Sequence, residues 1–154
     1  MVLAGPSLFG TPTGVGPETQ PRPAGTGKKG SGAAVGAGKS TKIQTHLNMW
    51  MISANTKSGL LVQDLFLFGQ GGNNNNGIIF NGVTFSKIQS VWVENCGSRG
   101  ILLTSDSNTC EVANNHCDVN NRGIELSGSD DCVVIGNIVT SSTQDGIKLN
   151  SCDN

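Results

Sequence analysis

Charged side chains recur at fixed offsets in the second half of the chain. Arg99, Arg122 and Asp145 each stand directly before a glycine, and Glu125 and Lys148 each stand two residues after one. Guanidinium groups bind carboxylates through paired hydrogen bonds, so the two arginines suit an acidic ligand. The alternative is that Arg122–Asp145 and Glu125–Lys148 are surface ion pairs, which contribute at most about 1 kcal/mol each.

A second set of acidic residues could hold a metal ion. Asp106 lies in one polar segment, and Asp130 and Asp131 lie in the next. Carboxylate oxygens are ligands that Ca²⁺ prefers, so these three residues form a candidate calcium site. The alternative is that Asp, Asn and Ser side chains in tight turns bond to nearby backbone donors.

The chain has five cysteines, none of them spaced as Cys-x-x-Cys. We expect Cys110 and Cys132 to stack as small apolar side chains facing a core, with their thiols reduced. Cys110–Cys117 or Cys117–Cys132 disulfides are the alternative, although an odd number of cysteines leaves one thiol free. The only two histidines, His46 and His116, are too few and too scattered to form a metal cluster.

These candidate residues lie on a repeat. The dipeptide Gly-Ile begins at residues 77, 100, 123 and 146, so the interval is 23 residues each time. Two residues after each Ile comes another large apolar residue, and the residue between them is charged in the last two copies. Apolar residues two apart, with charge tolerated between them, indicate a half-buried strand.

Each of these strands is followed by polar turn residues and, in the second and third copies, by a second apolar segment. The second segments contain Cys110 and Val112 in one copy and Val133 and Ile135 in the next. Asn114 and Asn137 then fall at the same offset from their glycines. A unit of this length cannot bury its own apolar face, so we expect successive units to stack as a solenoid.

The Gly-Ile strand, the polar turn and the recurring Asn resemble the right-handed parallel β-helix of pectin-lyase-like proteins. The resemblance covers residues 77–154 well and residues 32–76 loosely. It implies an all-β fold over 32–154, with regular coils starting at 77, 100, 123 and 146. Equal offsets in adjacent coils would then lie about 4.8 Å apart, which places Arg99, Arg122, Glu125, Asp145 and Lys148 near one edge of one sheet.

The first half is less regular. Residues 1–31 contain all five prolines and no apolar periodicity, which predicts a disordered segment. Residues 33–40 fit a relaxed phosphate-loop pattern, but the neighbouring residues favour a turn before an early coil instead. Residues 42–70 are interpreted as one divergent coil, and residues 71–76 as a loop too polar to pack.

Composition excludes several classes of partner. Ten Lys and Arg against eleven Asp and Glu give a net charge of −1, which argues against nucleic acid. No apolar run approaches the roughly 20 residues of a membrane span. The first residues lack the basic start and apolar core of a signal peptide. A location outside the cell, or on a cell or virion surface, is implied only by the β-helix resemblance.

The last repeat starts at Gly146, and the sequence ends at Asn154, nine residues into a 23-residue unit. A solenoid end needs a cap over its exposed core. We therefore expect a fragment of a longer β-helix, or a module that associates with another copy through uncapped ends.

The β-helix resemblance implies a function in handling polysaccharides. Gln144-Asp145-Gly146-Ile147 is similar to a polygalacturonase segment that supplies a catalytic carboxylate, which makes Asp145 the candidate catalytic residue. Arg99, Arg122, Glu125 and Lys148 would bind an acidic, uronate-containing glycan. The expectation is a fragment of a polysaccharide lyase, hydrolase or epimerase-like protein, with an incomplete catalytic site. The alternative is a non-catalytic structural or adhesive solenoid, such as a phage tail spike or a cell-surface repeat protein.

Overall fold

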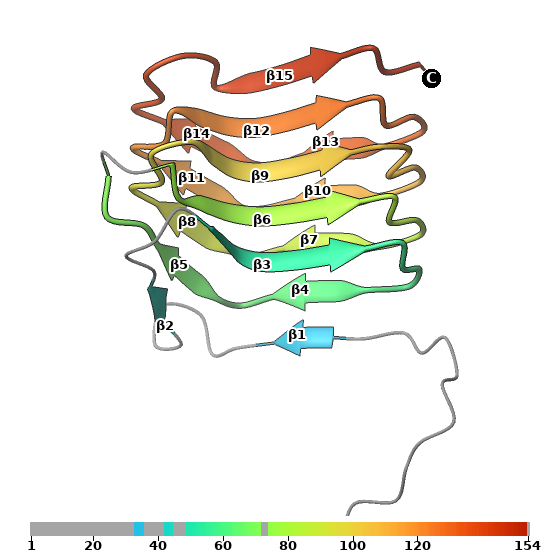
Figure 1. Cartoon of the computed structure of the whole chain (residues 1–154), viewed down its shortest axis with the longest axis horizontal. Coiled ribbons are helices and arrows are strands. Elements are labelled where there is room, and N and C mark those ends of the chain that lie inside the picture. The colour runs from blue at the N-terminus through green and yellow to red at the C-terminus, as the bar shows by residue number, and fades with distance from the viewer. Residues whose placement is uncertain (1–32, 36–41, 45–48, 72–73, 154) are drawn as a thin grey trace, which may run out of the picture.

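The 23-residue repeat folds as stacked coils of a right-handed parallel β-helix (Figure 1). The computed structural model describes residues 33–35, 42–44, 49–71 and 74–153. The predicted disordered segment 1–31 and most of the phosphate-loop pattern lie outside the described residues. Every named strand pairs in parallel with the strands of neighbouring coils, and the described residues contain no helix.

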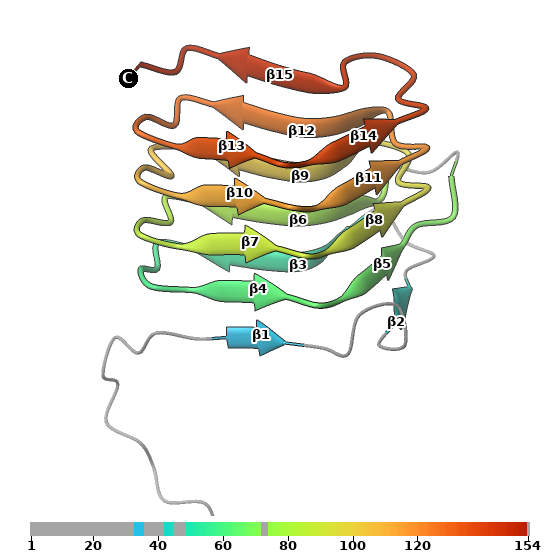
Figure 2. The same ribbon diagram turned by 180° about the vertical axis from the view of Figure 1, so that it is seen from behind.

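Three five-stranded sheets form the walls, and the chain passes from sheet C to sheet A to sheet B in each coil (Figures 1 and 2). Sheet A contains β1 (Ala33–Val35), β4 (Leu61–Gln63), β7 (Lys87–Gln89), β10 (Glu111–Ala113) and β13 (Val133–Ile135). Sheet B contains β2 (Lys42–Gln44), β5 (Phe66–Phe68), β8 (Trp92–Glu94), β11 (His116–Asp118) and β14 (Ile138–Thr140). Sheet C contains β3 (Trp50–Asn55), β6 (Asn76–Asn81), β9 (Arg99–Thr104), β12 (Arg122–Ser127) and β15 (Ile147–Asn150).

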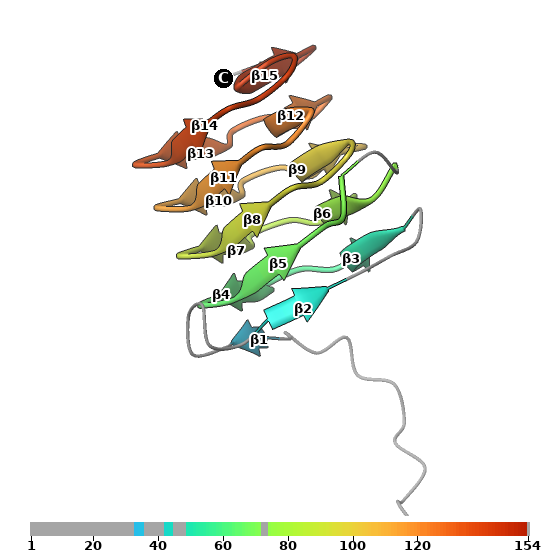
Figure 3. The same ribbon diagram turned by 90° about the vertical axis from the view of Figure 1, so that its left-hand side faces the viewer.

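Segment 42–70 contains more than one coil. Its first strand, β2, ends one coil, and β3, β4 and β5 form the next (Figure 3). This coil is three residues longer than the regular ones, because Trp50 pairs with Asn76 whereas Arg99 pairs with Arg122. The extra residues fall between β5 and β6. The prediction that residues 71–76 do not pack is wrong for Asn75, which is fully buried and accepts a hydrogen bond from the Gly97 amide.

The core between the walls is aliphatic. Each coil directs alternate side chains inward, and these residues stack on their equivalents one coil away. Ile78, Ile101 and Ile124 form one such row, as the Gly-Ile repeat predicts. The second apolar strand of each repeat is also confirmed as β10 and β13. On β13, however, Val134 packs against the core, and Val133 and Ile135 are exposed.

A polar row is built into the bend between sheets A and B. Asn115 accepts a hydrogen bond from the Val91 amide and donates one to the Ile88 carbonyl, and Asn137 repeats this pattern on Asn115 and Val112. The predicted equivalence of Asn114 and Asn137 is therefore wrong by one residue. The reason is that the turn from Thr104 to Glu111 is one residue longer than the turn from Ser127 to Val133.

The recurring glycine has a steric cause. A Cβ atom on Gly77 or Gly100 would lie 2.2 or 2.6 Å from the carbonyl oxygen of the equivalent glycine in the next coil. A Cβ atom on Gly123 would meet both the Gly146 carbonyl, at 2.6 Å, and Val139 Cγ1, at 2.3 Å. These approaches are far inside van der Waals contact, so Gly77, Gly100 and Gly123 have no room for a side chain; β3 carries Met51 at this offset.

Gly123→Ala should therefore destabilise the protein by about 1–3 kcal/mol, because the added methyl group must displace the next coil. Gly146→Ala is the matched control, since the nearest atom to its Cβ would be Val139 Cγ1 at 3.6 Å. Urea unfolding of the two variants measures the difference. Equal loss of stability in both variants would contradict the steric explanation.

Candidate functional site

The charged residues predicted to share an edge of one sheet do lie together. Arg99 and Arg122 are the first residues of β9 and β12 and are paired in the register of sheet C. Glu125 lies further along β12, opposite Leu102 on one side and Lys148 on the other. Asp145 precedes β15. These side chains project from the outer face of sheet C, because the inward positions on the same strands hold Ile and Leu.

Four of these residues form one chain of ion pairs. Glu125 Oε2 accepts hydrogen bonds from Arg99 Nε and, at 3.3 Å, from Arg122 Nη1. Arg122 Nε donates to Asp145 Oδ2 at 3.2 Å. The Glu125 side chain is only 7% exposed, whereas those of Arg99 and Arg122 are 33% and 23% exposed and that of Asp145 is 47% exposed. The carboxylate of Glu125 is therefore the buried centre of the chain, and the two guanidinium groups lie around it.

Of the two ion pairs named as the alternative, Arg122–Asp145 is present, and Glu125–Lys148 is not formed among the described residues. Lys148 is the register neighbour of Glu125, but within the described part of the chain its ammonium group forms no ion pair. The cause is the order in which these residues follow one another along the stack of coils. Arg99 lies one coil away from Glu125 on the other side, and Arg122 lies on the same strand three residues earlier, so both guanidinium groups reach Glu125.

The ion pairs leave one nitrogen donor group unused on each of the two arginines. Arg99 uses Nε for Glu125 and Nη1 for Ser98, and Arg122 uses Nε for Asp145 and Nη1 for Glu125. Among the described residues, neither Nη2 group has a protein partner. The carboxylates thus fix the orientation of two neighbouring guanidinium groups and leave one Nη2 group on each for a ligand.

The predicted calcium residues do not converge. Asp130 Oδ1 accepts a hydrogen bond from the Asp153 amide at 2.8 Å, and the amide of Asp130 bonds to Asn108 Oδ1. Asp106 and Asp131 occupy left-handed turn positions. No group of three or more His, Cys, Asp or Glu side chains in the described ranges is placed to hold a metal ion. The structure therefore gives no support for calcium, and Asp130 has the backbone-bonding role named as the alternative.

All five cysteines are free thiols, and Cys110 stacks on Cys132 as expected. Burial raises the pKa of Cys96 and of Cys117 to about 12. The other pair differs: the hydrogen bond between the two thiols lowers the pKa of Cys132 to about 7 and raises that of Cys110. Cys132 is only half-buried, whereas Cys96, Cys110 and Cys117 are buried.

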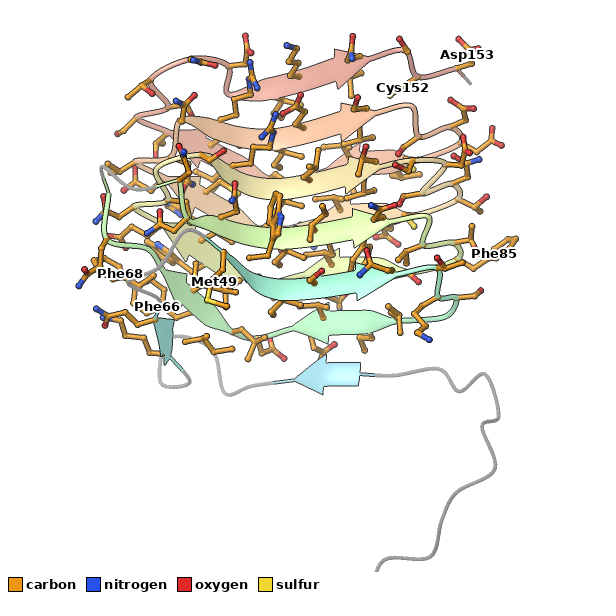
Figure 4. All side chains as sticks on the ribbon, viewed as in Figure 1. Met49, Phe66, Phe68, Phe85, Cys152 and Asp153 are labelled. Atoms are coloured by element: carbon orange, nitrogen blue, oxygen red, sulfur yellow. The ribbon has the colours of Figure 1, made fainter. Side chains whose placement is uncertain are left out.

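A row of aromatic rings on the outer face of sheet B was missed at the sequence level. Trp92 and His116 stack in parallel with ring centroids 3.9 Å apart, and Phe66 meets Trp92 edge to face at 6.5 Å. Lys42 Nζ lies 4.1 Å from the Phe68 ring centroid (Figure 4 labels Phe66 and Phe68). Register pairs on this sheet are separated by 26 and 24 residues, so a search at 23 residues does not align them.

The sequence model of one protein family matches residues 26–154, and the description of that family is periplasmic copper-binding protein NosD. The chain belongs to the NosD family. No curated protein and no solved structure matches the chain. The resemblance to pectin-lyase-like proteins thus holds for the β-helix fold, and membership of the NosD family is shown by the family match. The described residues of this NosD-family chain include no helix that is long and apolar enough to cross a membrane.

Copper raises the question of which residues of this NosD-family chain fit the metal. Thiolate and thioether sulfur select Cu(I), and imidazole suits several copper states. His116 is stacked on Trp92, with no second described histidine beside it. The donors that fit a soft ion are the neighbouring sulfurs of Cys110 and Cys132.

Removal of Glu125 should unbalance the ion-pair chain of sheet C. Glu125→Ala leaves two guanidinium groups side by side without their shared carboxylate, and we expect a loss of about 1–3 kcal/mol. This loss lies below the 3–5 kcal/mol typical of a fully buried pair, since both arginines are partly solvated.

Glu111→Ala is the control, because Glu111 pairs with Lys87 at 2.8 Å with both side chains more than one-third exposed. Chemical unfolding should show less than about 1 kcal/mol for that variant. A Glu111→Ala loss as large as that of Glu125→Ala would contradict the assignment.

Proposed function

We propose that the chain is a glycan-binding β-helix module that recognises acidic polysaccharides through Arg99 and Arg122. The observation that carries the proposal is the pair of oriented guanidinium groups on adjacent coils, each with an Nη2 group that forms no hydrogen bond with a described residue. Such groups bind carboxylates by charge-assisted hydrogen bonds. The same proposal places the protein outside the cytoplasm, in keeping with the word periplasmic in the NosD family description.

The geometry of the row favours a polymer over a small acid. Equivalent positions on adjacent coils repeat about every 4.8 Å along the axis of the β-helix. A chain of uronate residues laid along that axis can present carboxylates to both arginines, and Lys148 adds a cation one coil beyond Glu125. In this proposal Glu125 and Asp145 are positioning residues, because each fixes a guanidinium group.

A calorimetric titration with oligogalacturonate or alginate oligomers tests this binding. Arg122→Ala should weaken binding at least about tenfold, which corresponds to about 1.4 kcal/mol. Lys87→Ala removes one cation from sheet A and is the matched control, with an expected change of less than about twofold. Binding should weaken as salt increases, and a neutral glucan should not bind. Equal losses in both variants, or no binding to either acidic glycan, would remove the proposal.

A catalytic role of Asp145 is a separate question, and the same samples address it. Release of new sugar ends by the wild type, abolished in Asp145→Asn, would assign catalysis to this carboxylate. If Asp145 only positions Arg122, neither protein releases products, and Asp145→Asn lowers affinity alone. Inverting hydrolysis further requires a second carboxyl group about 6.5–9.5 Å away. The other carboxyl group of the row is that of Glu125, whose Oε2 atom is already bonded to both arginines.

A structural or adhesive solenoid is the second candidate, and one observation favours it. Val133, Ile135 and Ile138 on the outer faces of β13 and β14 are 52%, 58% and 56% exposed. Neighbouring aliphatic side chains at this exposure suit contact with another protein surface, including a second copy of this chain.

If this apolar surface mediates association, the sedimentation coefficient should rise with protein concentration. The double variant Ile135→Thr, Ile138→Thr should then sediment as a monomer. Val119→Thr, at a residue 46% exposed on a turn, is the control and should leave association unchanged. A concentration-independent monomer in the wild type would argue against this second candidate.

A further inference from the structure

The turns from sheet C to sheet A carry two thiols in adjacent coils. Cys110 and Cys132 directly precede the register partners Glu111 and Val133, and the Val133 amide donates to the Cys110 carbonyl at 2.9 Å. Their Cα atoms are therefore separated by about one inter-strand spacing of 4.7–4.9 Å. Both side chains turn inward. Cys110 Sγ lies 3.2 Å from the Val83 carbonyl oxygen, and Cys132 Sγ lies 3.1 Å from that of Ser107.

The two sulfurs form a pair with no third metal-binding side chain. Within the described segments, no set of three or more His, Cys, Asp or Glu side chains is arranged for a metal. The Asp130 carboxylate in the same turn is occupied elsewhere, since its Oδ1 atom accepts a hydrogen bond from the Asp153 amide. The pair therefore offers two adjacent soft sulfur ligands; Cys152 lines the same cavity as Cys132, but the described residues form no group of three that could hold a metal.

This donor set discriminates among metals. Structural Zn²⁺ takes four ligands, and Ca²⁺ takes six to eight oxygens, so neither ion is satisfied here. Soft thiolates select Cu(I), an ion that two sulfur ligands can satisfy. We propose that Cys110 and Cys132 together bind one Cu(I) ion, which bridges their two sulfur atoms.

Binding of Cu(I) at this pair needs no oxidant or reductant. Each thiol loses its proton to solvent, the metal stays in the +1 state, and two Cu–S bonds replace two S–H bonds.

Access is better at this pair than at Cys96 and Cys117, because Cys132 is only half-buried. Cys132 is half-buried and lines a cavity of about 340 Å³, together with Ser129, Val134 and Cys152. Cys96 and Cys117 are fully enclosed in the core. This metal site does not depend on the glycan proposal, because it faces inward and shares no residue with the ion-pair chain of sheet C.

The test is an anaerobic titration of the reduced full chain with Cu(I), in competition with a chromophoric Cu(I) chelator. We expect one tightly held Cu(I) per chain. Cys132→Ser and Cys110→Ser should each lower the affinity at least about 100-fold, because a single thiolate remains. The double variant Cys96→Ser, Cys117→Ser is the matched control and should retain the wild-type affinity within about threefold. X-ray absorption of the loaded protein should show two sulfur neighbours around copper.

Circular dichroism establishes that each variant is folded. Because Cys110 is fully buried, Cys132→Ser, at the half-buried position, is the decisive variant if Cys110→Ser does not fold. The proposal is overturned if the wild type binds no Cu(I), or if Cys132→Ser binds it as tightly as the wild type. Loss of binding in the Cys96/Cys117 double variant alone would also overturn it, by moving the site to that pair. Arg122→Ala should leave Cu(I) affinity unchanged.

Discussion

The close approach of backbones at the start of sheet C is the constraint on which the rest of the structure depends. In the coils that begin at Asn76, Arg99 and Arg122, the residue before the inward Ile lies so close to the next coil that it has no room for a side chain, whereas Met51 occupies this offset in β3. A Cβ atom on Gly100 or Gly123 would lie 2.6 Å from the carbonyl oxygen of the next glycine. With glycine at this offset, the isoleucines behind it stack on one another, and Arg99 and Arg122 in front of it fall on adjacent coils.

The same stacking explains which parts of the fold could be predicted from the sequence. The 23-residue interval was visible because two differences in turn length cancel. In the coil that starts at Arg99, the turn after β9 is one residue longer than in the following coil, and the turn after β11 is one residue shorter. The glycines therefore stay in phase while the residues between them shift. For this reason the Asn row was assigned to Asn114 rather than Asn115.

The sequence predicted which charged residues lie together on sheet C, but it did not predict which of them form ion pairs. Residues adjacent to the glycine share its phase, so Arg99, Arg122 and Asp145 were placed together correctly. Which cation Glu125 selects depends on side-chain reach, and the two arginines reach it ahead of Lys148. The aromatic row of sheet B lies beyond the turns whose lengths differ. Phe66, Trp92 and His116 are therefore not separated by 23 residues in the sequence, although each ring contacts the next one in space.

Several polar groups inside the solenoid share one hydrogen-bonding pattern, which separates the interior chemistry from the exterior. Asn115, Ser107 and Cys110 are buried, and each bonds to a backbone group of the adjacent coil, so the coil stacking itself satisfies them. The outward arginines are instead held by carboxylates. A ligand on the outer face of sheet C therefore exchanges solvent contacts and leaves the coil-to-coil bonds intact. A metal held by Cys110 and Cys132 would replace weak S–H contacts with carbonyl oxygens, which a sulfur atom loses at little cost. The same row geometry thus permits a charged outer site and a soft inner site on neighbouring turns, without either site disturbing the stack that positions both.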